Sequence, residues 1–510
     1  MSRKLLTIFS LMLIVSFVLT ACAAPAPAPA APAAQEQPKA AYDAKWAATP
    51  MQEKTTVVLS VESGAQEKTF QSFAPQLLQE MNIDLQVVAH PFSEQYEIQR
   101  LDLSSGAGQY DILSYWPMYT ADFHKWLVPL QDIQPAGQPG VEQDLEMTDI
   151  QDGYQWVYSY KGVQYATHYD GDVKLLNYRR DLFTDPNEKE AFKAKYGYEL
   201  DADTLTWDHY LQVGEFFTRP DQDFYGASEI AGFLGGFTLK DRLHGMGGHL
   251  FDYEQMKGLG GKGATGESNM DICIKAVQNG IDSFNKVMPP EAKSFEFEDA
   301  RNQIISEDRV AMMIQWPDVW KWANDPTKGS AAANCNVWVA ELPGFKAADG
   351  KVVHRPEENG GRVLVINKAS KQKEAAYKTL VWFSKKERTK ELVFNNDTWL
   401  DPYRKSHLVK ENMGALAKEC PETQQNYIDV INEGTVNGYP ALQIPGAGRY
   451  TEVLERWGKK AWAGQTTPQD ACASIAKEFD EITDELGRDA QVKEFQSYVD
   501  TVLKPKNLYP

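Results

Sequence analysis

Strand-like and helix-like segments alternate along this chain, and their order limits its fold more than any other feature of the sequence. Residues 55–61 are a β-branched run, residues 67–81 have the apolar spacing of a helix, and residues 83–88 alternate between apolar and polar. A second helical pattern at 94–104 precedes a short apolar strand at 110–113. This βαβαβ order predicts an α/β fold with parallel strands, helices on the faces of the sheet, and ligands at the carboxyl ends of the strands.

The same alternation resumes in the second half of the chain. Strands are expected at 310–314, 337–341 and 363–366, and helices at 270–287, 373–384, 450–463 and 468–486, the last with Thr467 as its N-cap. The roughly 460 residues that follow the N-terminal segments exceed what one hydrophobic core usually supports. Two or more lobes are therefore expected.

The N-terminus has the pattern of an export signal. Arg3 and Lys4 precede an apolar run at 5–18 that is shorter than the roughly 20 residues needed to span a membrane as a helix. The run ends in Leu-Thr-Ala-Cys, which resembles the lipobox of bacterial lipoproteins. The resemblance implies a signal peptide at 1–21 and a lipid anchor on Cys22. A plain secreted protein or a signal anchor is the alternative. The segment 22–50, rich in Ala and Pro, is expected to be an extended tether.

The charge balance argues against nucleic acid as a partner. Removing the signal peptide takes away Arg3 and Lys4 and no acid, so 50 basic residues remain against 71 acidic ones, a balance of −21. Affinity for phosphate backbones comes mainly from an excess of Lys and Arg, which this chain lacks.

Four cysteines follow Cys22, in a compartment that permits disulfides: Cys273, Cys335, Cys420 and Cys472. They allow three pairings. Two disulfides, one disulfide or four thiols all remain open.

The sequence contains no clear catalytic signature. No two cysteines have zinc-ligand spacing, the histidines contain no H-E-x-x-H, and no G-x-S-x-G occurs. We therefore predict no catalytic residue, no metal site and no cofactor. A hydrolase with two carboxylates stays open, because such a pair is defined in space and not by sequence spacing.

Aromatic and acidic side chains recur together near the ends of the expected strands. The pairs are Tyr115 and Trp116, Asp170 and Asp172, Trp316 and Asp318, and Trp399 and Asp401. Aromatic faces cover the apolar face of a sugar ring, and carboxylates accept charge-assisted hydrogen bonds from its hydroxyls. For any single ring, packing in the core is at least as good an explanation.

Several short strings follow one another at a characteristic spacing. They are Ser-Gly-Ala-Gly-Gln-Tyr-Asp-Ile at 105–112, Tyr-Lys-Gly-Val-Gln-Tyr-Ala at 160–166, Leu-Asn-Tyr-Arg-Arg-Asp-Leu-Phe at 176–183, Arg-Val-Ala-Met-Met at 309–313, Leu-Pro-Gly at 342–344 and Gly-Gly at 360–361. Their order resembles the extracytoplasmic solute-binding proteins of ABC importers, of the sugar-carrying maltose-binding-protein type.

The resemblance implies a two-lobe, type II periplasmic-binding-protein-like fold, each lobe a mainly parallel sheet flanked by helices, with the ligand in the cleft between the lobes. The lobes are expected at 51–169 with 360–400, and at 170–359 with 401–510. The crossings between them are expected near 169–172, 356–361 and 399–404. The expected binding residues are Tyr115, Trp116, Asp170, Asp172, Phe237, Trp316, Asp318, Trp399, Asp401 and Arg449.

The resemblance also implies a function, that of the receptor subunit of a carbohydrate ABC importer. Such a protein would be a monomer outside the cytoplasm, attached to the membrane by the lipid on Cys22, and would deliver a sugar to a permease. Two alternatives remain: a lipid-anchored carbohydrate-active hydrolase, and a receptor of the same fold for a polyamine, phosphorylated polyol or peptide.

Overall fold

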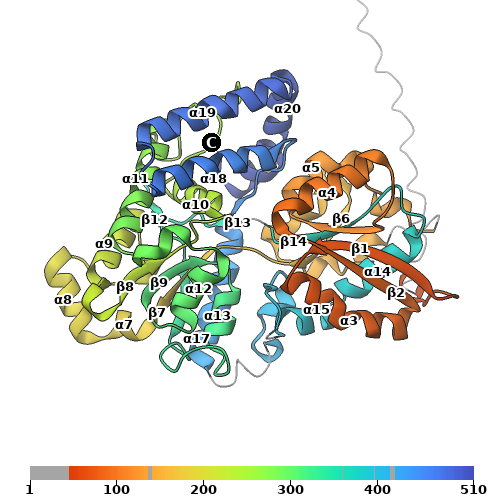
Figure 1. Cartoon of the computed structure of the whole chain (residues 1–510), viewed down its shortest axis with the longest axis horizontal. Helices are drawn as coiled ribbons and strands as arrows, with labels where there is room; N and C mark the ends of the chain where they lie inside the picture. Colours follow the sequence, from red (N-terminus) through yellow and green to blue (C-terminus); the bar gives the residue numbers. More distant parts are fainter. Residues whose placement is uncertain (1–44, 136–139, 359, 396, 414–419, 510) are drawn as a thin grey trace, which may run out of the picture.

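The chain folds into two α/β lobes that lie side by side (Figure 1). The computed structural model describes residues 45–135, 140–358, 360–395, 397–413 and 420–509. Cys22 and the predicted signal peptide lie outside these residues. Within the described ranges, none of the helices combines the length and apolar character that crossing a membrane requires.

The first lobe is built on a five-stranded sheet with strand order β2-β1-β3-β14-β6. Its strands are β1 (Thr55–Glu62), β2 (Ile83–His90), β3 (Ile112–Tyr115), β6 (Ala166–Asp170) and β14 (Arg362–Ile366). The longer helices around it are α3 (Ala65–Met81), α4 (Phe92–Ser105), α14 (Lys373–Ser384) and α15 (Lys386–Val393). Leu59, Ile112 and Val365 are almost completely buried, because helices cover both faces of such a sheet.

The second lobe is built on a four-stranded sheet with strand order β10-β7-β9-β8. Its strands are β7 (Leu175–Arg179), β8 (Tyr225–Ser228), β9 (Val310–Gln315) and β10 (Val337–Glu341). Its longer helices are α8 (Pro186–Tyr196), α9 (Trp207–Phe217), α10 (Gly235–Gly245), α11 (Asn269–Lys286), α12 (Phe297–Ile305), α13 (Asp318–Ala323) and α17 (Pro421–Asn437). The C-terminal helices α18 (Ala447–Trp462), α19 (Pro468–Glu485) and α20 (Arg488–Tyr498) cover the top of this lobe in Figure 1.

Most of the expected elements are confirmed, with small shifts at their ends. The predicted helix at 373–384 matches α14, and the predicted strand at 337–341 matches β10. Thr467 caps α19, accepting a hydrogen bond from the main-chain N–H of Asp470 at 3.1 Å. The predicted strand at 110–113 lies two residues too early, because β3 begins at Ile112.

The expectation of mainly parallel sheets is confirmed, because in each sheet all strands except one run in the same direction. β1 is parallel to β2 and β3, but β14 is antiparallel to both of its neighbours. In the second sheet β8 and β9 are parallel, whereas β7 is antiparallel to β9 and β10. A strand that enters a sheet from a crossing starts at the edge where the other strands end, and β14 and β7 both do so.

The crossings pack closely against one another. The first runs from the end of β6 to the start of β7, and the second from β13 (Glu357–Glu358) to β14. A Cβ atom at Gly361, whose φ is +64°, would lie 1.7 Å from the main-chain oxygen of Asp170. A Cβ atom at Gly171 would lie 2.4 Å from the main-chain oxygen of Pro402 on the third crossing. Glycine therefore permits this close approach of the three crossing segments.

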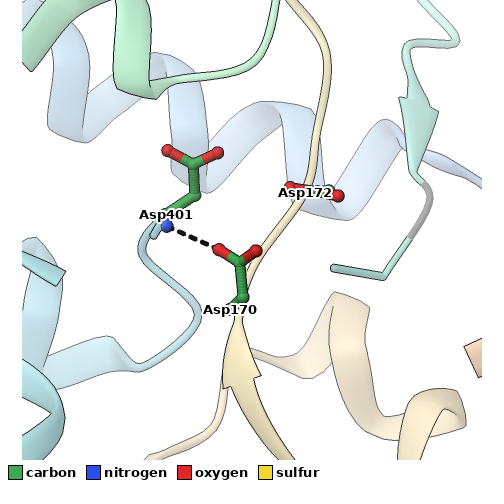
Figure 2. Close-up of side chains that lie close together, drawn as sticks. All are labelled: Asp170, Asp172 and Asp401. Atoms are coloured by element: carbon green, nitrogen blue, oxygen red, sulfur yellow. Dashed lines mark hydrogen bonds between the residues drawn. The ribbon is translucent and has the colours of Figure 1, made fainter. Parts of the chain in front are cut away.

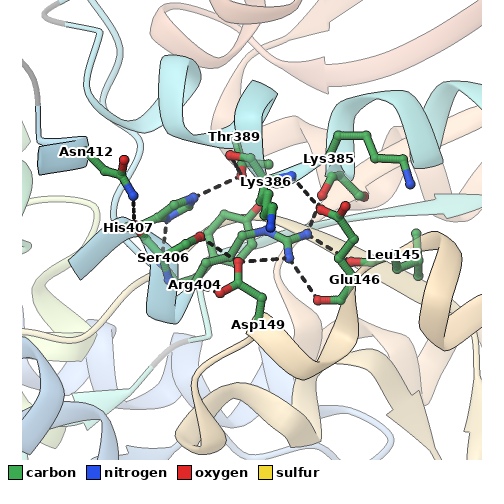
Figure 3. A network of polar contacts seen from close by, with 12 residues as sticks. Leu145, Glu146, Asp149, Lys385, Lys386, Thr389, Arg404, Ser406, His407 and Asn412 are labelled. Atoms are coloured by element: carbon green, nitrogen blue, oxygen red, sulfur yellow. Dashed lines mark hydrogen bonds and ion pairs between the residues drawn. The ribbon is translucent and has the colours of Figure 1, made fainter. Parts of the chain in front are cut away.

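Arg404 holds the third crossing to the first lobe (Figure 3). Its guanidinium donates to the main-chain oxygens of Leu145 at 3.0 Å, Glu146 at 3.1 Å and Ser384, and lies 3.7 Å from the Asp149 carboxylate. The side chain is only 1% exposed. Most of its N–H groups donate to main-chain oxygens of the first lobe, so they fix the position at which the third crossing leaves that lobe.

The cysteines form two disulfides, Cys273–Cys472 and Cys335–Cys420. The first joins α11 to α19, and the second joins the segment before β10 to the residue that precedes α17. This selects one of the three pairings that the sequence left open.

The end of the predicted tether needs correction, since the helix α2 (Lys45–Ala48) packs on the first lobe. Ala47 is 2% exposed, and the Trp46 ring stacks on Tyr377 with centroids 5.5 Å apart. The exact lobe boundaries at 169/170, 359/360 and 400/401 stay a prediction.

Candidate functional site

A cavity of about 410 Å³ lies where the two lobes and the crossings meet. It is lined by Glu62, Gln66, Phe92, Trp116, Asp170, Asp172, Phe233, Leu234, Glu296, Phe297, Glu298, Asp299, Trp316, Asp318, Arg362, Trp399 and Asp401. Both lobes contribute rings and carboxylates, so a molecule in the cavity touches both of them.

The strand order explains how residues far apart in sequence reach this place. Glu62 ends β1, Phe92 begins α4 just after β2, and Trp116 directly follows β3. The carboxyl ends of these parallel strands lie at one edge of the sheet. Trp316 directly follows β9 in the second sheet, and Arg362 begins β14, which starts at the same edge of the first sheet.

Seven of the residues expected from the sequence line the cavity: Trp116, Asp170, Asp172, Trp316, Asp318, Trp399 and Asp401. Three do not. Tyr115 is 2% exposed in the core of the first lobe, against Phe123 at 5.4 Å. Phe237 lies behind the wall, packed against Trp116 at 5.1 Å and Trp316 at 6.2 Å. Arg449 forms an ion pair with Glu485 at 2.6 Å, away from the cavity lining.

The residues that the sequence did not indicate are mainly those next to strand or helix ends. They are Glu62, Gln66, Phe92, Phe233, Leu234, Glu296, Phe297, Glu298, Asp299 and Arg362. Glu62 and Phe92 could have been found, because they follow the first two predicted strands. Glu296 to Asp299 open the helix α12, and only the tertiary fold brings that helix end to the first lobe.

Three aspartates converge at the crossings (Figure 2). One carboxylate oxygen from each of Asp170, Asp172 and Asp401 lies within 4.8 Å of the others. Asp170 accepts hydrogen bonds from the main-chain N–H of Asp401 at 2.8 Å and from the Gln66 amide at 3.3 Å. Such oxygens are ligands for hard cations and acceptors for ammonium or hydroxyl groups.

Burial makes ionisation of this cluster unfavourable. It raises the pKa of Asp170 to about 6, although the nearby Arg362 opposes the shift. Burial, followed by the charge of Asp170, raises the pKa of Asp172 well above its ordinary value. Burial, followed by the charges of Asp318 and Asp170, does the same for Asp401. Ionisation of one of Asp170, Asp172, Asp318 and Asp401 therefore makes ionisation of the others less favourable.

Two arginines neutralise part of this charge. Arg362 lies 2.9 Å from Glu62 and 3.5 Å from Asp172, and it is the only Lys or Arg among the residues that line the cavity. Arg301 forms an ion pair with Asp318 at 3.0 Å from behind the wall. Arg362 also covers the Trp116 ring, with its guanidinium carbon 4.5 Å from the centroid. Six rings in all line the cavity: Phe92, Trp116, Phe233, Phe297, Trp316 and Trp399.

Replacing Asp401 by Asn is expected to stabilise the protein at neutral pH. The raised pKa of Asp401 means that its charge opposes folding above its ordinary titration range, and this cost disappears as the pH falls and the carboxyl is protonated. Urea unfolding should show Asp401→Asn gaining about 1 to 3 kcal/mol at pH 7.5 and much less at pH 4. Asp397→Asn, at an exposed residue of the same segment, should show no such pH-dependent gain. A gain that is equal at both pH values would contradict this explanation.

Comparison with known proteins gives consistent matches. The model of the family described as bacterial extracellular solute-binding protein matches residues 62–390, more than half of the chain. A probable amino-acid ABC transporter periplasmic-binding protein of Sinorhizobium fredii is 22% identical over 309 residues, which is 59% of this chain and 62% of that relative. The chain thus matches less than two thirds of that relative's length.

Solved structures match over most of the chain. A solute-binding protein of Agrobacterium radiobacter in complex with ribitol has a TM-score of 0.67 and 20% identity, covering 85% of this chain and all of that one. The maltose-bound MalE3 of T. maritima has a TM-score of 0.66 and 21% identity, covering 84% of this chain and all of that one. A mannitol-bound solute-binding protein of Agrobacterium vitis has a TM-score of 0.65 and 19% identity, covering 85% and 99%. At these identities the matches establish the two-lobe fold.

Proposed function

We propose that the chain, which belongs to the family of bacterial extracellular solute-binding proteins, captures a sugar or polyol between its lobes and delivers it unchanged to an ABC permease. The observation that carries the proposal is the cavity, because rings and carboxylates of both lobes line it. A solute there has more contacts when the lobes are closed than when they are apart. Its differential affinity for the closed form shifts the population toward closure.

The polar atoms of the cavity favour a hydroxylated solute. The indole N–H groups of Trp116 and Trp316 are buried and have no hydrogen-bond partner among the described residues. The same holds for the acceptor oxygens Oε1 of Gln66 and Oδ1 of Asp401. A hydroxyl group both donates and accepts, so a polyol can satisfy donors and acceptors while its C–H face packs on the rings.

The same site is poorly suited to a free amino acid, the solute named for the relative from Sinorhizobium fredii. An α-carboxylate needs a cation or several N–H donors. Arg362, the single basic residue of the lining, already pairs with Glu62 and Asp172. Ribitol, maltose and mannitol, the ligands of the structural neighbours, carry no carboxylate. We therefore place sugars and polyols first.

The remaining parts of the proposal come from the sequence. A lipid on Cys22 would attach the protein to the outer face of the cell membrane, and the Ala/Pro-rich segment would hold the lobes away from the surface. The protein would act as a monomer, with lobes at 51–169 with 360–400 and at 170–359 with 401–510. Anchoring raises the effective concentration of the receptor near its permease.

The test combines binding, closure and product analysis on one preparation. Ribitol, mannitol and maltose are titrated by calorimetry, and a solute at 100 times its dissociation constant should add about 2.7 kcal/mol to the unfolding free energy. X-ray scattering should show a smaller radius of gyration with the solute bound. The solute should be recovered intact. New reducing ends would instead support the hydrolase, with two of the clustered aspartates as its carboxylate pair.

A further inference from the structure

Acidic groups far outnumber basic ones in the cavity wall. Arg362 is the one residue of the lining that carries a positive charge. Eight residues of the lining carry a carboxylate: Glu62, Asp170, Asp172, Glu296, Glu298, Asp299, Asp318 and Asp401. Glu296, Glu298 and Asp299 are exposed at the start of α12, where Glu296 and Asp299 form its capping box, so their presence has a local reason. The charge that requires a further explanation is that of the buried aspartates.

The nearby basic residues leave part of this charge unpaired. Arg362 is engaged by Glu62 and Asp172, and Arg301 lies 3.0 Å from Asp318 and 3.6 Å from Glu298. The buried Lys321 donates to the main-chain oxygens of Thr398 at 2.8 Å and Val393 at 3.0 Å. Its ammonium donates to main-chain carbonyls, and it acts on the pKa of Asp401 through its charge but forms no ion pair with that carboxylate among the described residues.

Asp170 and Asp401 remain without an ion pair among the described residues. Neither has a Lys, Arg or His nitrogen within 4.0 Å there. Asp401 is 1% exposed and Asp170 is 3% exposed, yet both line the cavity. The Oδ1 atom of Asp401 and the Oδ1 atom of Asp318 are buried with no hydrogen-bond partner in the described part of the chain. Buried carboxylate oxygens in this condition destabilise the protein unless a bound group pairs with them.

The rings beside these oxygens suit a cation as well as a sugar. Trp316 and Trp399 line the same cavity as Asp318 and Asp401, and Phe297 lies 5.6 Å from the Trp316 centroid and 5.3 Å from the Trp399 centroid. A cation over the face of such a ring is attracted by its quadrupole, most strongly where water is excluded. Lys174 lies 4.9 Å from the Trp316 centroid and Arg301 lies 4.9 Å from the Trp399 centroid, so a bound ammonium would use the other face of each ring. One oxygen each from Asp170, Asp172 and Asp401 gives three close ligands, fewer than the six to eight that Ca²⁺ takes. A primary ammonium needs only about three acceptors.

We infer that the captured solute carries a protonated amine, which binds between the carboxylates of Asp170 and Asp401 and the neighbouring aromatic rings. This inference rests on the proposed function and narrows it to an amino-substituted sugar or polyol. The ammonium supplies a cation in direct contact with Asp170 and Asp401, which Arg362 and Lys321 affect only from a distance. The hydroxyls of the same molecule satisfy the indole N–H groups of Trp116 and Trp316. A polyamine carries the same ammonium group as an amino-substituted sugar or polyol, so it is included in the test below.

Matched pairs of solutes test the charge alone. Calorimetry at pH 7.5 compares sorbitol with glucamine, and glucose with glucosamine and N-acetylglucosamine, on the full folded protein. We expect the amine of at least one pair to bind at least about tenfold more tightly than its neutral counterparts. Asp401→Asn should remove most of this preference, and Asp170→Asn serves as a second variant if the first does not fold. Asp397→Asn should keep the preference, because Asp397 is exposed and outside the lining.

The outcomes separate failure of this inference from failure of the proposed function. Equal or tighter binding of the neutral member of each pair overturns the amine and leaves a sugar receptor. If spermidine binds and no amino sugar or aminopolyol does, the inference of a protonated amine stands and the proposal of a sugar or polyol as the solute is overturned. CaCl₂ binding that Asp401→Asn abolishes, with no amine preference, overturns the inference in favour of a metal site. No binding by any compound of the panel, neutral or amine, overturns both proposals.

Discussion

Replacing Trp316 by leucine is expected to weaken solute binding by about 10- to 100-fold, the range for a central aromatic contact. Trp316 directly follows β9 and is the indole that the second sheet places in the cavity. Its ring is fixed by Phe237 at 6.2 Å and Phe297 at 5.6 Å. A fixed ring loses little entropy when a solute packs on it. Calorimetry with the solute that binds best in the panel measures the loss directly.

Trp462→Leu is the matched control for this substitution. Trp462 is 1% exposed in the same lobe, packs on Phe284 at 5.4 Å, and does not line the cavity. Both variants should lose stability through a core void, which thermal unfolding will show. Only Trp316→Leu should lose affinity. If the two variants lose affinity equally, the effect is a general loosening of the lobe and Trp316 is not a contact residue.

Local patterns predicted the elements well, because each depends on neighbouring residues. The β-branched run at 55–61 and the helical spacing at 67–81 became β1 and α3 within two residues. The reversed direction of β14 and β7 is harder to predict, because it depends on where the chain re-enters a sheet. The periodicity of the segment at 363–366 predicts a strand, but it does not show that the chain arrives there from the second lobe. The resemblance to a two-lobe family supplies that information, since it implies a crossing near 356–361 and a return to the first lobe.

The choice between Tyr115 and Trp116 shows how finely a site depends on register. Successive side chains of a strand point to opposite faces, so one residue decides between core and cavity. Tyr115 ends β3 and its hydroxyl lies 3.4 Å from that of Thr120 in the core. Trp116 comes after the strand and reaches the cavity. The sequence indicates both residues as binding candidates and contains no local signal that distinguishes the core residue from the cavity residue.

The resemblance places Asp170, Asp172 and Asp401 at the expected crossings, but no local pattern shows how closely their carboxylates approach one another. The raised pKa values that follow from this approach and from burial could not be predicted from the sequence. Gly171 and Gly361 are what allow the crossings to approach so closely. The resulting cluster costs folding energy, and such costs are expected mainly at functional sites.

Replacing Arg362 by methionine is expected to lower the unfolding free energy by about 3 to 5 kcal/mol at pH 7.5, the range for removing one partner from a buried ion pair. Arg362 lies 2.9 Å from Glu62 and 3.5 Å from Asp172, and it also covers the Trp116 ring. Methionine keeps the length of the side chain and removes the charge. The buried Asp172 and the partly buried Glu62 would then lose the cation with which they pair. Urea unfolding monitored by tryptophan fluorescence measures the loss.

Three comparisons separate lost charge from lost packing. The loss should shrink as the pH falls from 7.5 to 4, because burial and Asp170 already raise the pKa of Asp172, and a protonated carboxyl needs no cation. Adding Glu62→Gln to the Arg362→Met variant should recover part of the loss, since one unpaired charge is removed. Arg100→Met removes an exposed ion pair with Glu97 from the same lobe and should cost less than about 1 kcal/mol. A loss of similar size at every pH, unchanged by Glu62→Gln, would mean that Arg362 acts through its packing on Trp116 and not as the cation of the site.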